Sequence, residues 1–338
     1  MVGMSKRALR IKPNFSSVKL SARQSMTLLV VSIVFLVGAL AAWYQLYYTR
    51  PSVVFWGAFD NALNTPGVLK QTTITAADNS TDVTAAMRFE DVPAVQLRTV
   101  LKQMVPSADG ASKESQATAE SIGIADGDFQ RYIQTPTEVD TPEQQVIFDK
   151  IVGKWVQTGQ PTQGRPNQIY IDGLFSAIPF GDLNGRQRNA MLNFARNGSD
   201  NREPILTVDY NAVKKTWQNM RPVYSFDATI DASSYAKWYQ QYLSFMGFDE
   251  FAQPKYTDAV GQVLGLSEKA VFTIEVDAWS HTLVRVTRSN EAQGSKIVEE
   301  IKAIGFAPDI QAPAEHISRE EFQAIIAGDS NQQPESGQ

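Results

Sequence analysis

An uninterrupted apolar stretch near the N-terminus constrains this chain more than any other feature of its sequence. No charged residue occurs between Arg23 and Arg50, and residues Met26 to Tyr48 are mostly apolar. A helix of roughly 20 such residues crosses the ~30 Å hydrocarbon core of a bilayer. The stretch ends on aromatic residues, which favour the membrane–water interface: Trp43, Tyr44, Tyr47 and Tyr48. The sequence therefore predicts a transmembrane helix over residues 26–48.

The charges that flank this helix predict its orientation. Residues 1–25 contain no acid and six cations, namely Lys6, Arg7, Arg10, Lys12, Lys19 and Arg23. Such an excess keeps a flank in the cytoplasm and favours anionic lipid headgroups. We expect a single-pass protein of the cell membrane, with residues 1–25 as a cytoplasmic tail and residues 51–327 as an extracytoplasmic domain. Residues 328–338 are polar and are expected to be disordered.

A cleaved signal peptide is the alternative to a retained helix. Ala39-Leu40-Ala41 has the small-x-small form of a cleavage site, with Met26 to Gly38 as the apolar region before it. The long basic segment and the continuation of the apolar run into aromatic residues favour retention. Both readings place the rest of the chain outside the cytoplasmic membrane.

Charge and cysteine content exclude several classes of function. Taking the seven cations of residues 1–50 from the overall charge of −5 leaves −12 for the remaining chain. Such a surface binds nucleic acid poorly, because phosphate contacts dominate that affinity. The chain has no cysteine, which excludes disulfides, thiolate metal sites, cysteine nucleophiles and lipoprotein acylation. We expect no metal and no cofactor.

The exported part begins with a helix and continues as a series of strands. Ser52 to Asn64 has the spacing of an amphipathic helix, with Trp56, Phe59 and Leu63 on one face. Short turns separate the strand-like runs that follow, and such gaps cannot hold crossover helices, so the sheet should be antiparallel with one wet face. These runs are residues 69–77, 82–90, 94–104, 115–124 and 128–135. The fold class is predicted as α+β.

The stretch from Pro222 to Arg288 predicts strand, helix pair and hairpin. The strand Val223 to Asp231 precedes a helix for which Ser233 is a plausible N-cap. A second helix is predicted over Tyr256 to Leu264, and the strands 270–278 and 283–288 form a hairpin. The first helix carries aromatic residues at helical spacing: Tyr235, Trp238, Tyr239 and Tyr242.

This order of parts resembles the LolA/LppX-type bowl, a half-barrel found in lipoprotein carriers and mycobacterial lipid-binding lipoproteins. The residues that carry the resemblance are Phe55 to Val68, the run GKWVQT, Tyr224 to Tyr242 and Val271 to Arg288. The chain also resembles uncharacterised single-pass membrane proteins of candidate-phylum bacteria such as Saccharibacteria. The first resemblance implies a curved antiparallel sheet with helices on its concave face.

The bowl resemblance also implies a site. In such proteins the concave face and its helices enclose an apolar cavity for acyl chains. Carried over to this chain, the cavity is lined by Trp56, Phe59, Tyr235, Trp238, Tyr239 and Tyr242. The alternative for the aromatic helix is ordinary core packing against the sheet. The two interpretations differ only in whether the space between helix and sheet is filled.

No catalytic motif appears in the sequence. There is no nucleophile elbow, phosphate-binding loop, zinc-protease motif or dinucleotide fingerprint. The only histidines, His281 and His316, are expected at the surface in a turn and near the C-terminus. Glu299 and Glu300 are neighbours, so their side chains point in different directions and form no acid/base pair. We expect a binding protein and not an enzyme.

The sequence therefore supports two functions. The first is a membrane-anchored extracytoplasmic binding protein for a lipid or another apolar ligand. The second is a surface sensor or interaction module with the same fold and no ligand. No feature of the sequence identifies a protein partner.

Overall fold

The computed structural model describes residues 22–90, 92–106, 112–134, 142–160, 168–174, 176–198, 204–253, 269–290 and 294–330. The chain divides into two compact units, Met1–Arg50 and Pro51–Gln338, and each is described by itself. The predicted helix 256–264, most of the predicted basic tail and residues 331–338 lie outside the described residues.

The first unit contains one long apolar helix. Helix α1 covers Ala22–Trp43 and continues into the π-helix η1, Tyr44–Tyr48. The segment Met26–Tyr48 has 23 residues with a mean hydropathy of 2.4. Its aromatic end is ordered by ring contacts, since the centroids of Tyr44 and Tyr48 lie 5.3 Å apart in a stacked arrangement. By length and composition this helix fits a membrane anchor or a signal sequence.

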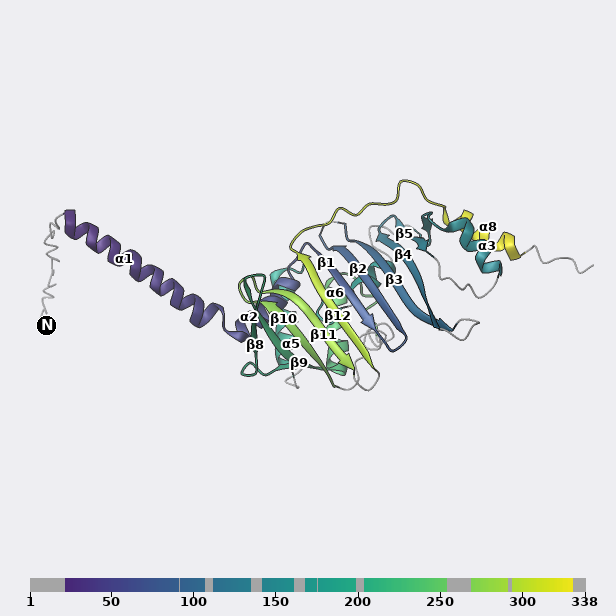
Figure 1. Cartoon of the computed structure of the whole chain (residues 1–338). Helices are drawn as coiled ribbons and strands as arrows, with labels where there is room; N and C mark the ends of the chain where they lie inside the picture. Colours follow the sequence, from purple (N-terminus) through teal and green to yellow (C-terminus); the bar gives the residue numbers. More distant parts are fainter. Residues whose placement is uncertain are drawn as a thin grey trace, which may run out of the picture. The chain divides into compact units, whose positions relative to one another are not determined.

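Within the described residues of the second unit, twelve strands form one sheet in which every named strand pairing is antiparallel. The order is β6-β5-β4-β3-β2-β1-β12-β11-β10-β9-β7, and β8 also pairs with β9. The order has two ends, so the sheet is open and not closed into a barrel (Figure 1). The strands are β1 Gly67–Thr75, β2 Asn79–Arg88, β3 Ala94–Pro106, β4 Ser112–Ile124, β5 Gly127–Gln134, β6 Val156–Gln157, β7 Leu206–Val208, β8 Lys214–Gln218, β9 Arg221–Asp231, β10 Lys269–Asp277, β11 Thr282–Asn290 and β12 Ser295–Ile304.

Helices cover one face of this sheet. Helix α2 packs on β9, β10 and β11, α4 packs on β3 and β4, and α6 packs on β9 and α5. The helices α3 and α8 pack on each other, and α8 also contacts β6. The prediction of an α+β fold with an apolar N-terminal helix and an open antiparallel sheet is confirmed. The helices are α2 Pro51–Ala62, α3 Pro142–Ile151, α4 Gln168–Leu174, α5 Gly185–Asn197, α6 Ala232–Phe245 and α8 Arg319–Ser330.

The side chains that cap helices α6 and α8 can be identified from their hydrogen bonds. The N-cap of α6 is Asp231 and not Ser233, because the Asp231 carboxylate accepts the backbone N–H of Ser234 at 2.8 Å. Ser233 instead donates its hydroxyl to Asp231. At α8 Ser318 is the capping residue, since its Oγ accepts the N–H of Glu321 at 3.1 Å. This helix extends to Ser330 and so includes the first three residues of the predicted polar tail.

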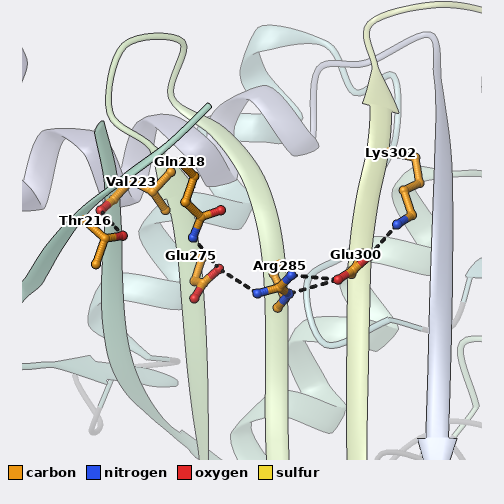
Figure 2. A network of polar contacts seen from close by, with 7 residues as sticks. All are labelled: Thr216, Gln218, Val223, Glu275, Arg285, Glu300 and Lys302. Atoms are coloured by element: carbon orange, nitrogen blue, oxygen red, sulfur yellow. Dashed lines mark hydrogen bonds and ion pairs between the residues drawn. The ribbon is translucent and has the colours of Figure 1, made fainter. Parts of the chain in front are cut away.

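The opposite face of the sheet carries a row of charged side chains. Figure 2 shows Arg285 on β11 between Glu275 on β10 and Glu300 on β12. Its guanidinium nitrogens lie 3.4 Å from Glu275 Oε2 and 2.7 Å from Glu300 Oε1. Lys302 also pairs with Glu300, and these two cations lower the pKa of that carboxyl. Each pair is partly exposed and is worth about 0 to 1 kcal/mol. This is the predicted wet face, called the outer face below.

Candidate functional site

One row of side chains crosses the helix-bearing face, called the inner face, over eight strands. The strand registers place these residues side by side from β4 to β9. Along this row the inner face has two regions. We call them the small-residue wing (β1–β4) and the packed wing (β9–β12). Its members are Ala119, Thr99, Val83, Thr72, Glu299, Val286, Ile274 and Phe226.

In the packed wing this row is fully covered. Phe226 and Ile274 are 0% exposed and Val286 is 3% exposed. Phe55 of α2 lies edge-on to Phe226, with ring centroids 5.1 Å apart. Large apolar side chains therefore fill the space between α2 and these strands.

Helix α6 adds a ladder of aromatic hydrogen-bond donors. The hydroxyls of Tyr235, Tyr239 and Tyr242 donate to backbone carbonyls at 2.7, 3.0 and 2.6 Å, and Trp238 Nε1 donates to a carbonyl at 3.0 Å. Burial raises the pKa of all three tyrosines well above the usual value, so they remain neutral donors. Tyr235 donates to the carbonyl of Ser176, Tyr239 to that of Leu174, Tyr242 to that of Phe180 and Trp238 to that of Met191.

The structure brings most of the predicted cavity residues into one buried cluster. Phe59 on α2 and the four hydrogen-bonding aromatic residues of α6 are each 0% or 1% exposed. Trp56 is only partly buried, and the Arg196 guanidinium stacks on its ring at 4.7 Å. The packing alternative accounts for these contacts. That the six side chains line a ligand cavity remains a prediction.

The small-residue wing begins beneath α4. There the inner face carries Val68, Met87, Val95 and Gly123, which are buried neighbours on four strands. Two glycines allow the helix to come this close. A Cβ on Gly123 would lie 2.8 Å from the backbone N of Tyr170, and a Cβ on Gly173 would lie 2.8 Å from Val95 Cγ2. Helix α4 is therefore seated directly on the sheet at this row.

Away from α4 the same face becomes accessible. In the next row of inner side chains, two residues further along each strand from the row under α4, Ala85 is 2% exposed, while Leu97 and Ser121 are already partly exposed. The next row, from Thr72 to Ala119, is partly exposed on every strand of this wing. So is the row beyond it, which consists of Ile74, Thr81, Leu101 and Ala117. The wing thus presents a strip of aliphatic and hydroxyl-bearing side chains.

A buried ion pair marks the border between the wings. Lys70 on β1 and Glu299 on β12 are 3% and 5% exposed, and Lys70 Nζ lies 3.6 Å from Glu299 Oε2. Ser176 donates its hydroxyl to the other oxygen of Glu299. Buried charges are stable only when paired in this way. Sequence reasoning missed the pair, although the alternation of β1 places Lys70 on the inner face with Val68 and Thr72.

A second buried acid lies on β5, beside the start of α4. Burial raises the pKa of Asp128 to about 6. Its Oδ2 accepts the N–H of Ile169 at 3.5 Å, and within the described residues its Oδ1 has no hydrogen-bond partner. The alternation of residues predicts a strand over residues 128–135 but does not indicate that the acid at its first position is buried.

The structure also shows where the two histidines and the neighbouring acids Glu299 and Glu300 lie. His281 is 7% exposed and packs on Gly57 of α2, so the expectation of a surface histidine is wrong there. His316 meets the ring of Phe129 at 5.0 Å. Glu299 and Glu300 point to the inner and outer faces, as predicted. Among the described residues no group of three His, Asp or Glu side chains is placed to hold a metal ion.

Two hollows lie away from the aromatic cluster. One, of about 630 Å³, is lined by Arg131, Trp155 and residues 313–317. The other, of about 360 Å³, lies beside the β8–β9 hairpin and is lined by Gln218, Asp277 and Lys302 among others. The six predicted cavity residues line neither hollow.

Comparison with known proteins adds little to this description. No protein-family model and no curated protein matches the chain. Among solved structures, the chain is similar to the crystal structure of LprF from Mycobacterium bovis, with 10% sequence identity and a TM-score of 0.33. The match covers 79% of this chain and 97% of that chain. A likeness this distant supports no inference, so the fold rests on the strand pairing described above.

Proposed function

We propose that this chain is a single-pass membrane protein whose extracytoplasmic domain binds a lipid or another apolar ligand without catalysing a reaction. The ligand lies on the inner face of the small-residue wing, beyond α4. The N-terminus is cytoplasmic, and the helix over residues 26–48 is retained.

The observation that carries this proposal is the gradient of exposure along the inner face. Met87 and Val95 are buried under α4, whereas the two rows farthest from α4 are partly exposed on all four strands. Burying apolar surface contributes about 25 cal/mol per Å². An acyl chain laid on this strip would remove such surface from water without displacing a packed side chain.

A second candidate is an interaction module that binds no ligand. The hydrogen-bonded aromatic ladder of α6 favours it, because Tyr235, Tyr239 and Tyr242 already have partners. In this case the inner face of the domain would serve as a rigid core.

Photocrosslinking in membranes distinguishes the two. The full chain is embedded in bilayers that contain a phospholipid with a diazirine on its acyl chain, and labelled peptides are identified by mass spectrometry after irradiation. We expect labels on residues 26–48 and also on the inner residues of β1–β4. Labelling confined to residues 26–48 would contradict ligand binding by the domain and favour the interaction module.

Two neighbouring residues of β3 provide matched variants. Thr99→Trp fills the inner strip, whereas Arg98→Trp places the same ring on the outer face of the same strand. Thr99→Trp should abolish labelling of β1–β4 and leave labelling of residues 26–48 unchanged. Arg98→Trp should retain both, so that an equal loss in the two variants would count against the proposed surface.

A further inference from the structure

The tips of two hairpins form an exposed aromatic patch, which we call the hairpin-tip patch. It consists of Trp217 at the end of β8, Met220 in the β8–β9 turn and Trp279 in the β10–β11 turn, which are 70%, 85% and 46% exposed. The two indole rings meet edge to face with centroids 6.1 Å apart. Large exposed side chains gathered in this way mark an interaction surface.

The β8–β9 turn holds its apolar residue outward at a conformational cost. Gln218 and Arg221 pair, so Asn219 and Met220 alone form the turn, with φ of 51° and 61°. Two-residue hairpin turns of this kind favour glycine at the second position. A methionine there adopts a backbone conformation that costs of order 1 kcal/mol or more. Folding therefore gives no reason for Met220.

The second turn is held rigidly against α2. Asp277 accepts the N–H groups of Trp279 and Ser280 at 2.8 and 3.0 Å and pairs with Arg221 at 3.2 Å. Asn61 of α2 donates to the carbonyls of Ser280 and His281 at 3.1 and 2.7 Å. The position of Trp279 is therefore tied to α2.

If residues 26–48 span the membrane, the covalent chain keeps the first residue of α2 close to it. Tyr48 and Pro51 are separated by at most about 11 Å of chain. Asn61 lies ten residues further along α2, which is about 15 Å. The hairpin-tip patch is thus fixed to a helix that begins at the point where the chain leaves the bilayer.

The local charge also suits a lipid surface. Lys214 and Lys215 are exposed on β8, although the net charge of the domain is negative. Tryptophan favours the interfacial region of a bilayer, and lysines close to it attract anionic headgroups.

We propose that the hairpin-tip patch inserts into the interface of the bilayer that holds the anchor and so fixes the orientation of the domain. This inference rests on the membrane anchoring in the proposed function, but not on ligand binding.

The absence of cysteine allows a direct test with single spin labels. Met220→Cys, Gln96→Cys and Leu36→Cys are made separately in the full chain and reconstituted in vesicles of phosphatidylcholine and phosphatidylglycerol. Collision rates with oxygen and with a water-soluble nickel chelate report the depth of each label. The Gln96 side chain is exposed on the outer face of β3 and serves as the control for water.

We expect the label at position 220 to lose collisions with the chelate and to approach the Leu36 value, while the label at position 96 stays accessible. Equal accessibility at 220 and 96, with Leu36 in lipid, would overturn the insertion and leave the anchor intact. Water-like behaviour at Leu36 would instead refute the anchor. Protection of position 220 that appears only in native membranes would assign the patch to a protein partner and also overturn the proposal.

Two further variants separate insertion from folding. Met220→Gly gives the turn a favoured Asn-Gly sequence and should raise the melting temperature while reducing insertion of a label at position 217. Lys215→Gln, on the same face of β8 as Trp217, should reduce the inserted population roughly fivefold in anionic vesicles and leave it unchanged in neutral ones. A loss of insertion that follows a loss of stability would contradict the assignment.

Discussion

The packed wing and the small-residue wing share one continuous row of inner side chains, yet the row is covered in one and accessible in the other. Phe226 and Ile274 are 0% exposed beneath α2, whereas Val83 and Thr99 on the same row are partly exposed. The strand pairing is antiparallel throughout. The difference therefore comes from side-chain size and helix placement and not from the architecture of the sheet.

The largest expected contrast is between core truncations in the two wings. Trp238→Ala should lower the free energy of unfolding by about 4 kcal/mol, because it leaves a cavity and removes the hydrogen bond from the indole N–H to the Met191 carbonyl. Leu101→Ala in the small-residue wing should cost about 1 kcal/mol, since this side chain is partly exposed. Urea unfolding of the full chain in mild detergent measures both. Equal losses would mean that the two wings are packed alike.

The border between the wings depends on its ion pair. Lys70→Met should cost about 3 kcal/mol, because it leaves the Glu299 carboxylate buried without its cation. The double variant Lys70→Met with Glu299→Leu should regain most of that loss. The same urea series provides the double-mutant cycle, and additive losses would contradict the coupling.

A single added methyl group at Gly123 should disturb the packing of α4 on the sheet. Gly123→Ala should cost about 2 to 3 kcal/mol, because the new Cβ would meet the backbone of Tyr170. Gly185→Ala is the matched control, since nothing lies within 4 Å of the added atom there. Thermal unfolding by circular dichroism should show a loss in the first variant only.

The smallest effect concerns Asp128 and depends on pH. Its folded pKa of about 6 lies above the ordinary 3.8, so the folded state binds the proton more tightly and stability falls as the pH rises from about 4 to 6. Asp128→Asn removes this loss. The variant should match the parent at pH 4 and exceed it by about 2 kcal/mol at pH 8. A constant difference between pH 4 and 8 would refute the assignment.

Much of the fold follows from local patterns, whereas the site depends on contacts between distant residues. Alternation in the runs around Val95 and Phe226 gives both strands and their inner faces, and short turns give the antiparallel order. The same patterns do not indicate that Lys70 meets Glu299 or that Gly57 makes room for His281, because those partners are more than 200 residues apart. The run around Tyr170 does not show a helical period, because α4 has only seven residues and its polar face consists of just Gln168 and Asp172.

The pairing of β1 with β12 has a consequence for the order of folding. Val68 pairs with Ile304, so the first and last strands of this part of the sheet meet only when nearly the whole domain has been made. If the domain emerges from the membrane N-terminus first, hairpins β1 to β5 can form as they appear. Helix α2 emerges before them but must wait for β9 to β11, which bury Phe55. During that interval the apolar face of α2 lacks the strands that cover it in the folded domain.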